Sequence, residues 1–213
     1  MELIIVRHGR PLTERRTGGI ADPSLDPHGL WQAERVCSWL AHEPVDAVIF
    51  SPKARAKETV QPLADRLGLP IAIIDDLDEI DRRSSVYVPT DLWSTDATDI
   101  LDALREGRFE DVGYDRPEAF RERVHRAWAE LLASDPGKRV VVACHGGTIQ
   151  EILRSVVGEG GSSLSVTVDY ASITRVAVAE HGPRMVSLNE TGHFDADRIA
   201  IRGAMHLAST VEP

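Results

Sequence analysis

Short apolar runs alternate along the chain with longer segments in which apolar residues recur every three or four positions. The short runs predict strands, and the longer periodic segments predict helices. The strands are expected at 3–6, 46–50, 71–74 and 139–143. The helices are expected at 28–42, 53–67, about 96–104, 117–133 and 148–157. Two further strands, 172–179 and 184–188, flank the turn residues 181–183 and predict a hairpin.

Details of the pattern set expectations for individual helices. The helix at 28–42 is expected to place Leu30, together with Ala33 and Val36, on its buried face. Pro62 predicts a bend or a break in the following helix, because proline removes a backbone donor. Gly68 is a helix stop signal.

Strands that alternate with helices predict an α/β fold, a three-layer α/β/α sandwich whose mostly parallel sheet has an antiparallel edge. The length of 213 residues suits one buried core. We therefore expect a single domain over 1–193, with an irregular cap segment at about 75–115 and a C-terminal tail at 194–213. The glycine-rich stretch 158–163 predicts a flexible loop.

Histidines and glycines follow two of the predicted strands. Arg7-His8-Gly9 ends the first strand, and His145-Gly146-Gly147 ends the strand at 139–143 and opens a helix. Ligands of open α/β sheets bind outside the carboxyl ends of the strands, so His8 and His145 are expected at one edge. Arg55 opens the helix after another strand and can reach the same edge. Two arginines and two histidines there predict a phosphate site, because the guanidinium fork binds two oxygens at once.

An ordered series of motifs resembles the histidine phosphatase superfamily, also called the phosphoglycerate mutase-like family, over nearly the whole chain. The series comprises Arg7-His8-Gly9, Leu25-Asp26-Pro27-His28-Gly29 with Gln32-Ala33, Ser51 to Thr59, Leu77-Asp78-Glu79, His145-Gly146-Gly147, Tyr170 to Thr174 and Asn189 to His193.

The resemblance implies a phosphoglycerate mutase-like fold and a phosphomonoester hydrolase. His8 would attack phosphorus and become a phosphohistidine, while Arg7, Arg55 and His145 hold the phosphoryl oxygens. Gly146 would also contribute to phosphate binding. Glu79 would protonate the leaving oxygen and then deprotonate water. Neither a metal nor another cofactor is required in this scheme.

Two segments depart from the family pattern. Arg10-Pro11 follows the first motif, and Glu14 stands where relatives carry an asparagine. Arg10 is expected to add positive charge near the mouth of the site. Ile80-Asp81-Arg82-Arg83 follows Glu79 in place of a G-x-x-E-G continuation, so Asp81 stays open as the alternative acid.

Three activities remain open: a phosphatase, a mutase that returns the phosphoryl group to its substrate, and a phospho-ligand binding or signalling module with little catalysis. A cysteine phosphatase is disfavoured, because Gln150 rather than arginine lies six positions after Cys144. Cys37 fails the same test and is expected, like Cys144, in the core. Lys57 is expected on a solvated helix face, whereas Lys53 fits either environment.

Composition narrows the partners. The net charge of −10 disfavours nucleic acid and anionic membranes, so a small phosphorylated substrate is expected, with a phosphoprotein as an alternative. Two cysteines and the lack of a signal-peptide pattern predict a cytoplasmic protein. The sequence is compatible with a homodimer.

Overall fold

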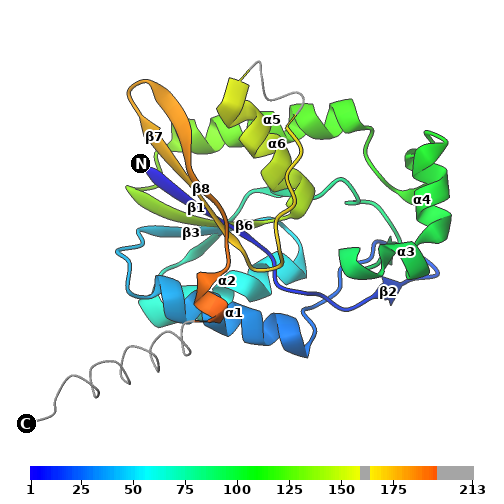
Figure 1. The fold of residues 1–213 in the computed structure, drawn as a ribbon, viewed down its shortest axis with the longest axis horizontal. Coiled ribbons are helices and arrows are strands. Elements are labelled where there is room, and N and C mark those ends of the chain that lie inside the picture. Colours follow the sequence, from blue (N-terminus) through cyan, green and yellow to red (C-terminus); the bar gives the residue numbers. More distant parts are fainter. Residues whose placement is uncertain (159–163, 196–213) are drawn as a thin grey trace, which may run out of the picture.

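A six-stranded sheet forms the centre of the computed structural model, which describes residues 1–158 and 164–195 (Figure 1). Its strand order is β4-β3-β6-β1-β7-β8. The strands are β1 (Glu2–Arg7), β3 (Ala47–Phe50), β4 (Ile71–Ile73), β6 (Arg139–Cys144), β7 (Ile173–Ala179) and β8 (Gly182–Glu190). β4, β3, β6 and β1 are parallel, whereas β7 runs antiparallel to both β1 and β8. The predicted mostly parallel sheet with an antiparallel edge is therefore confirmed.

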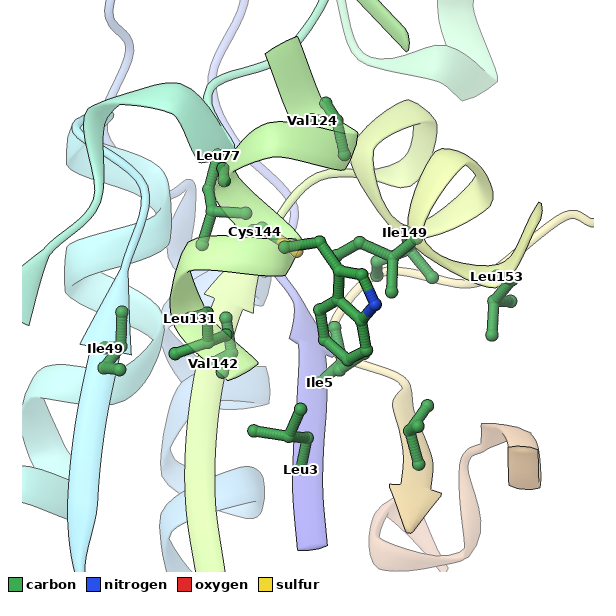
Figure 2. Packing of buried hydrophobic residues seen from close by; sticks show 14 of the residues in the cluster. Leu3, Ile5, Ile49, Leu77, Val124, Leu131, Val142, Cys144, Ile149 and Leu153 are labelled. Carbon is green, nitrogen blue, oxygen red and sulfur yellow. The ribbon is translucent and has the colours of Figure 1, made fainter. Parts of the chain in front are cut away.

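Helices cover both faces of this sheet, as expected for strands that are apolar on both sides. α1 (Pro27–Leu40) and α2 (Ala54–Leu67) pack on one face, around Ile4 and Val6 of β1. α5 (Pro117–Ser134) and α6 (Gly146–Val157) pack on the other face. Figure 2 shows Leu3 and Ile5 of β1 in that second core, together with Val124 and Leu131 of α5 and Ile149 and Leu153 of α6. This three-layer arrangement confirms the predicted sandwich.

Three local expectations are corrected. Leu30 is 51% exposed, because the first turn of α1 approaches the Arg10 backbone through Gly29 and leaves Leu30 outside this contact. α2 runs unbroken through Pro62, so the break expected as one alternative there is absent, and the helix ends at its left-handed cap, Gly68, as predicted. β8 begins at Gly182, earlier than predicted, because Pro183 lies on an edge strand, where a missing donor is tolerated.

The segment 75–115 forms a cap on the side of the sheet to which the parallel strands point (Figure 1). It contains β5 (Val86–Tyr87), α3 (Trp93–Asp96) and α4 (Thr98–Arg105), with 3-10 turns at Asp75–Leu77, Thr90–Leu92 and Glu110–Val112. β5 pairs with β2 (Glu14–Arg15), a contact between the cap and the loop after β1 that the sequence pattern did not predict. The cap has a small hydrophobic core, separate from the two cores of the sheet, that includes Val88, Ile100 and Tyr114.

The last described element is the 3-10 turn Gly192–Phe194, which contacts α1. Most of the predicted tail, from residue 196 onward, and residues 159–163 of the predicted loop lie outside the described residues. The division into one domain and a tail stays a prediction.

Candidate active site

Strand register brings the two histidines together. β1 and β6 are parallel neighbours with Arg7 opposite Cys144, so His8 and His145 leave the sheet side by side. The His8 amide donates to the Cys144 carbonyl over 2.9 Å, and the imidazole centroids lie 5.1 Å apart. Ser51, which follows β3, donates its amide to Ala143 in β6 at 3.0 Å. The carboxyl ends of three parallel strands thus meet at this edge.

His8 is buried, and its contact with Gly9 decides which of its ring nitrogens carries the proton. Nδ1 lies 2.8 Å from the Gly9 carbonyl oxygen, an acceptor, so Nδ1 carries the proton and Nε2 keeps its lone pair. Burial, followed by the guanidinium charges of Arg55 and Arg7, holds the pKa of His8 well below its usual range. The imidazole is therefore neutral, the form required of a nitrogen nucleophile.

The arginines offer donors that the protein itself does not use. Arg55 is fully buried, and among the described residues none of its three guanidinium nitrogens has a hydrogen-bond partner. The Nε of Arg7 is likewise buried without such a partner. Arg7 is held in place by its Nη1 bond to the Val168 carbonyl at 2.6 Å. Buried donors without acceptors are costly, so this arrangement indicates a site for an anion that supplies several oxygens.

Aromatic rings support both guanidinium groups. The Arg7 Cζ lies 3.9 Å from the Tyr170 ring centroid, and the Arg55 Cζ lies 4.4 Å from that of Tyr87. Both rings also lie within 6.5 Å of the His8 ring, centroid to centroid. Tyr170 belongs to the Tyr170–Thr174 motif of the superfamily. Nothing in the local sequence of Tyr87 signalled its role, because β5 reaches the site only through its pairing with β2.

His145 is buried behind His8. Its Nε2 lies 2.5 Å from the Ser51 hydroxyl oxygen, while its Nδ1 has no hydrogen-bond partner in the described residues. If the hydroxyl donates to Nε2, Nδ1 carries the proton and is a free donor. Burial, then the positive charge of Arg55, lowers the pKa of His145 well below its usual range.

Glu79 is fixed by two backbone donors, one of them at the start of α6. Its Oε2 accepts from the Gly147 amide at 2.8 Å, and its Oε1 accepts from the Ile80 amide at 2.9 Å. Burial, followed by the nearby charge of Asp81, raises the pKa of Glu79 to about 7. A carboxyl group with this pKa exchanges a proton near neutral pH, as a general acid and base must.

Asp81, the alternative acid, faces Arg55 at 3.6 Å and also lines the site. Its Oδ1 has no hydrogen-bond partner in the described part of the chain. Of the two carboxyl groups, Glu79 has the backbone contacts that hold a proton-transfer group in place.

Arg123 is a buried residue that the sequence analysis missed. Its guanidinium group donates to the carbonyls of Asp76, Asp78 and Glu79 at 2.8–3.0 Å and pairs with Asp115 at 3.0 Å. These contacts join α5 to the loop that carries Glu79. An arginine in an amphipathic helix usually predicts a solvated face, so nothing in the sequence indicated that Arg123 is buried and supports the Glu79 loop.

A cavity of about 180 Å³ joins these groups and is called the catalytic cavity below. Its lining includes five of the six predicted site residues and the alternative acid Asp81, and consists of Arg7, His8, Arg55, Glu79, Ile80, Asp81, Tyr87, Val88, Thr90, Trp93, Tyr114, Gly146 and Gly147. His145 is adjacent to it through the His8 ring.

Arg10 and Glu14, which depart from the family pattern after the first motif, lie outside the catalytic cavity. Arg10 forms ion pairs with Asp26 and Asp91 and does not line the catalytic cavity, so its charge is neutralised rather than offered at the mouth. Glu14 lies in β2 and bonds to the Asp22 amide.

The structure also shows which of the lysines and cysteines considered from the sequence are buried. Lys53 is buried and donates to the Arg82 carbonyl at 3.1 Å, whereas Lys57 is exposed. Cys37 and Cys144 are buried, free thiols, as expected, and burial raises the pKa of both. Within residues 1–158 and 164–195, no group of three or more His, Cys, Asp or Glu side chains could hold a metal ion.

The model of the histidine phosphatase superfamily (branch 1) matches residues 3–191. The chain belongs to this superfamily. The resemblance drawn from the motifs is thereby confirmed.

Relatives of this histidine phosphatase support the same assignment. The Bacillus subtilis (strain 168) protein named uncharacterized phosphatase PhoE is 25% identical over 195 residues, covering 89% of this chain and 95% of its own. Phosphoglycerate mutase-like protein 4 of Arabidopsis thaliana is 31% identical over 158 residues, covering 71% and 69%. The crystal structure of the alpha-ribazole phosphatase from Shigella flexneri has a TM-score of 0.70 at 22% identity, covering 89% and 96%, and shares the fold.

One glycine beside the site has a steric role that can be tested. A Cβ atom added at Gly147 would overlap the Glu79 carboxylate. We expect Gly147→Ala to displace Glu79 and lower kcat for an alkyl phosphate roughly 10- to 100-fold, because small misplacements of a reacting group are that costly. Gly18→Ala, where an added Cβ meets nothing within 4 Å, is the matched control. An unchanged kcat in Gly147→Ala would contradict the position given to Glu79.

Proposed function

We propose that this histidine phosphatase hydrolyses a phosphomonoester through a phosphohistidine on His8. The observation that carries the proposal is the composition of the catalytic cavity. A neutral imidazole, guanidinium nitrogens without hydrogen-bond partners among the described residues, and a carboxyl group with a pKa near neutrality share one small space. Phosphoryl transfer depends mainly on positioning and on charge stabilisation, and this set supplies both.

In the first step, His8 Nε2 attacks phosphorus and the bond from phosphorus to the leaving oxygen breaks. The donors of Arg7, Arg55 and His145 stabilise the charge on the phosphoryl oxygens, and Gly146 at the start of α6 lies beside them. The protonated Glu79 gives its proton to the leaving oxygen, so an alcohol departs.

In the second step, Glu79 as a carboxylate takes a proton from water while the water oxygen attacks phosphorus. The N–P bond breaks, His8 returns to its neutral form, and phosphate is released.

Trapping the intermediate tests this scheme. After rapid mixing with a phosphate ester and denaturation in base, we expect intact-mass analysis to show a single added phosphoryl group, because a phosphoramidate survives base. The group should disappear after acid treatment and map to the peptide that contains His8. Steady turnover without such a species, or with an acid-stable phosphoester, would contradict the phosphohistidine.

The same reaction mixture separates the alternatives. Release of inorganic phosphate indicates a phosphatase, whereas an isomerised phosphate ester indicates a mutase. The binding-module alternative is disfavoured, because a binding site has no need of Glu79 held by two backbone amides.

We propose a small phosphorylated molecule as the substrate, rather than a phosphoprotein, because the catalytic cavity has a volume of only about 180 Å³ and is lined by the cap residues Tyr87 and Trp93. A cytoplasmic location is also proposed, since two free, buried thiols suit a reducing compartment. No helix in the described residues has the length and apolar character to cross a bilayer. Self-association into a homodimer stays a prediction.

A further inference from the structure

A second cavity, of about 510 Å³, continues from the catalytic cavity between the cap and helices α5 and α6. We call it the side groove. The two cavities share Arg7, Ile80, Thr90, Trp93, Gly146 and Gly147. The shared residues Ile80 and Gly147 hold Glu79 through their amides, so a leaving group that departs on the side of Glu79 has a direct path into the side groove.

The walls of the side groove near this junction are largely apolar. Trp93 from the cap, Phe120 from α5 and Val166 and Val168 from the segment before β7 line it. An apolar wall favours carbon chains or rings over water, so this part of the groove suits an organic spacer.

Charged side chains line the side groove beyond these walls. Arg121 of α5 lies 3.3 Å, through Nε, from Glu151 Oε2, and Arg154 of α6 lies 2.5 Å, through Nη1, from Glu151 Oε1. Apart from Arg7, which lies at the junction with the catalytic cavity, two guanidinium groups around one carboxylate leave a single positive charge in excess in this part of the side groove. This surplus stands out in a chain with a net charge of −10, and one positive charge matches a monoanion.

Arg121 is the group with donors to spare. Its side chain is 46% exposed, and Nε is its only hydrogen-bonded nitrogen among the described residues. Arg154 instead also donates through Nε to the Leu164 carbonyl at 3.1 Å, and Arg7 uses both Nη1 and Nη2. The two terminal nitrogens of Arg121 thus form an available fork of the kind that binds a carboxylate.

We propose that the side groove binds the leaving group of the substrate and that Arg121 binds a carboxylate at its far end. This inference rests on the proposed phosphatase activity. The substrate class is a phosphomonoester whose leaving group has an apolar spacer ending in a carboxylate. The spacer must be extended, because Arg121 lines the side groove but not the catalytic cavity.

Synthetic esters of graded length test the proposal. A series of ω-carboxyalkyl phosphates would be compared with the ω-carbamoylalkyl phosphates of the same lengths, which lack the charge. We expect the acids to be preferred over the amides only in the longer members, in which the carboxylate reaches Arg121.

Arg121→Gln should lower kcat/KM for the preferred acid roughly 10- to 100-fold, the range of one charge-assisted contact. The loss should fall mainly on KM, since the contact is the same in the ground state and the transition state. The amides should be unaffected, and Arg121→Lys should recover part of the preference. Arg126→Gln is the control, because Arg126 lies on the same helix, pairs with Asp76 and does not line the side groove.

The outcomes separate the two levels of the proposal. Acids and amides hydrolysed equally at every length, or Arg121→Gln affecting both alike, would overturn the carboxylate site and leave the phosphatase intact. A stronger preference for alkanediol bisphosphates over the acids would overturn the assignment of a monoanion. No hydrolysis of any ester by the unmodified chain would contradict the phosphatase and this inference together.

Discussion

His8→Ala is expected to lower kcat/KM for p-nitrophenyl phosphate by about 10⁴-fold or more, because it removes the atom that forms the bond to phosphorus. Arg7, Arg55 and His145 stay in place in this variant, so phosphate or vanadate should still bind to the folded protein. Activity is measured as the steady-state release of nitrophenol, and vanadate binding is measured by calorimetry.

The control is His181→Ala, which alters an exposed histidine in the turn between β7 and β8. It should keep the activity of the unmodified chain. Substantial activity in a pure, folded sample of His8→Ala would refute the role of His8 as the nucleophile.

Glu79→Gln is expected to lower kcat for an alkyl phosphate by about 10²- to 10⁴-fold, the usual contribution of a general acid. With p-nitrophenyl phosphate the first step should survive, because nitrophenolate leaves without a proton. The second step still needs a base, so a burst of nitrophenol followed by slow turnover is expected. Rapid-mixing absorbance measurements distinguish these phases.

The pH dependence follows from the same group. Glu79 must be protonated for the first step, and its pKa of about 7 makes that step slow down as the pH rises through neutrality. Asp81 is the second cause of the raised pKa, after burial, so Asp81→Asn should lower the pKa and move this loss of rate to lower pH. Glu79→Gln should abolish the pH dependence. If Asp81→Asn abolished it instead, while Glu79→Gln retained it, Asp81 would be the acid.

The predictable part of the site lies at strand ends. The apolar run before Arg7 and the run before His145 were readable as strands, and parallel strands bring their carboxyl ends to one edge. Arg55 was readable for the same reason, since it opens α2 directly after β3. The sequence also predicted the layer order, because strands apolar on both faces require helices on both sides.

The cap was the least predictable region. β2 and β5 are two-residue strands that pair across more than seventy positions of the chain, and neither has a periodicity long enough to detect. Tyr87 consequently reaches Arg55 through a pairing that no local pattern announces. Arg123 was hidden for a related reason, since three of its partners are backbone carbonyls, which are the same for every residue type.

By itself, the sequence determined the strand-end residues, the superfamily and the histidine expected to attack phosphorus, because motif and strand order are properties of the linear chain. Tertiary structure alone decided how these groups behave. The neutrality of His8 and the raised pKa of Glu79 come from burial and from charges brought in by distant segments. The side groove arises where α5, α6 and the cap meet, and its surplus positive charge exists only because Arg121, Glu151 and Arg154 converge there. Desolvation and Coulomb interactions depend on distances in space, which local patterns in a sequence do not contain.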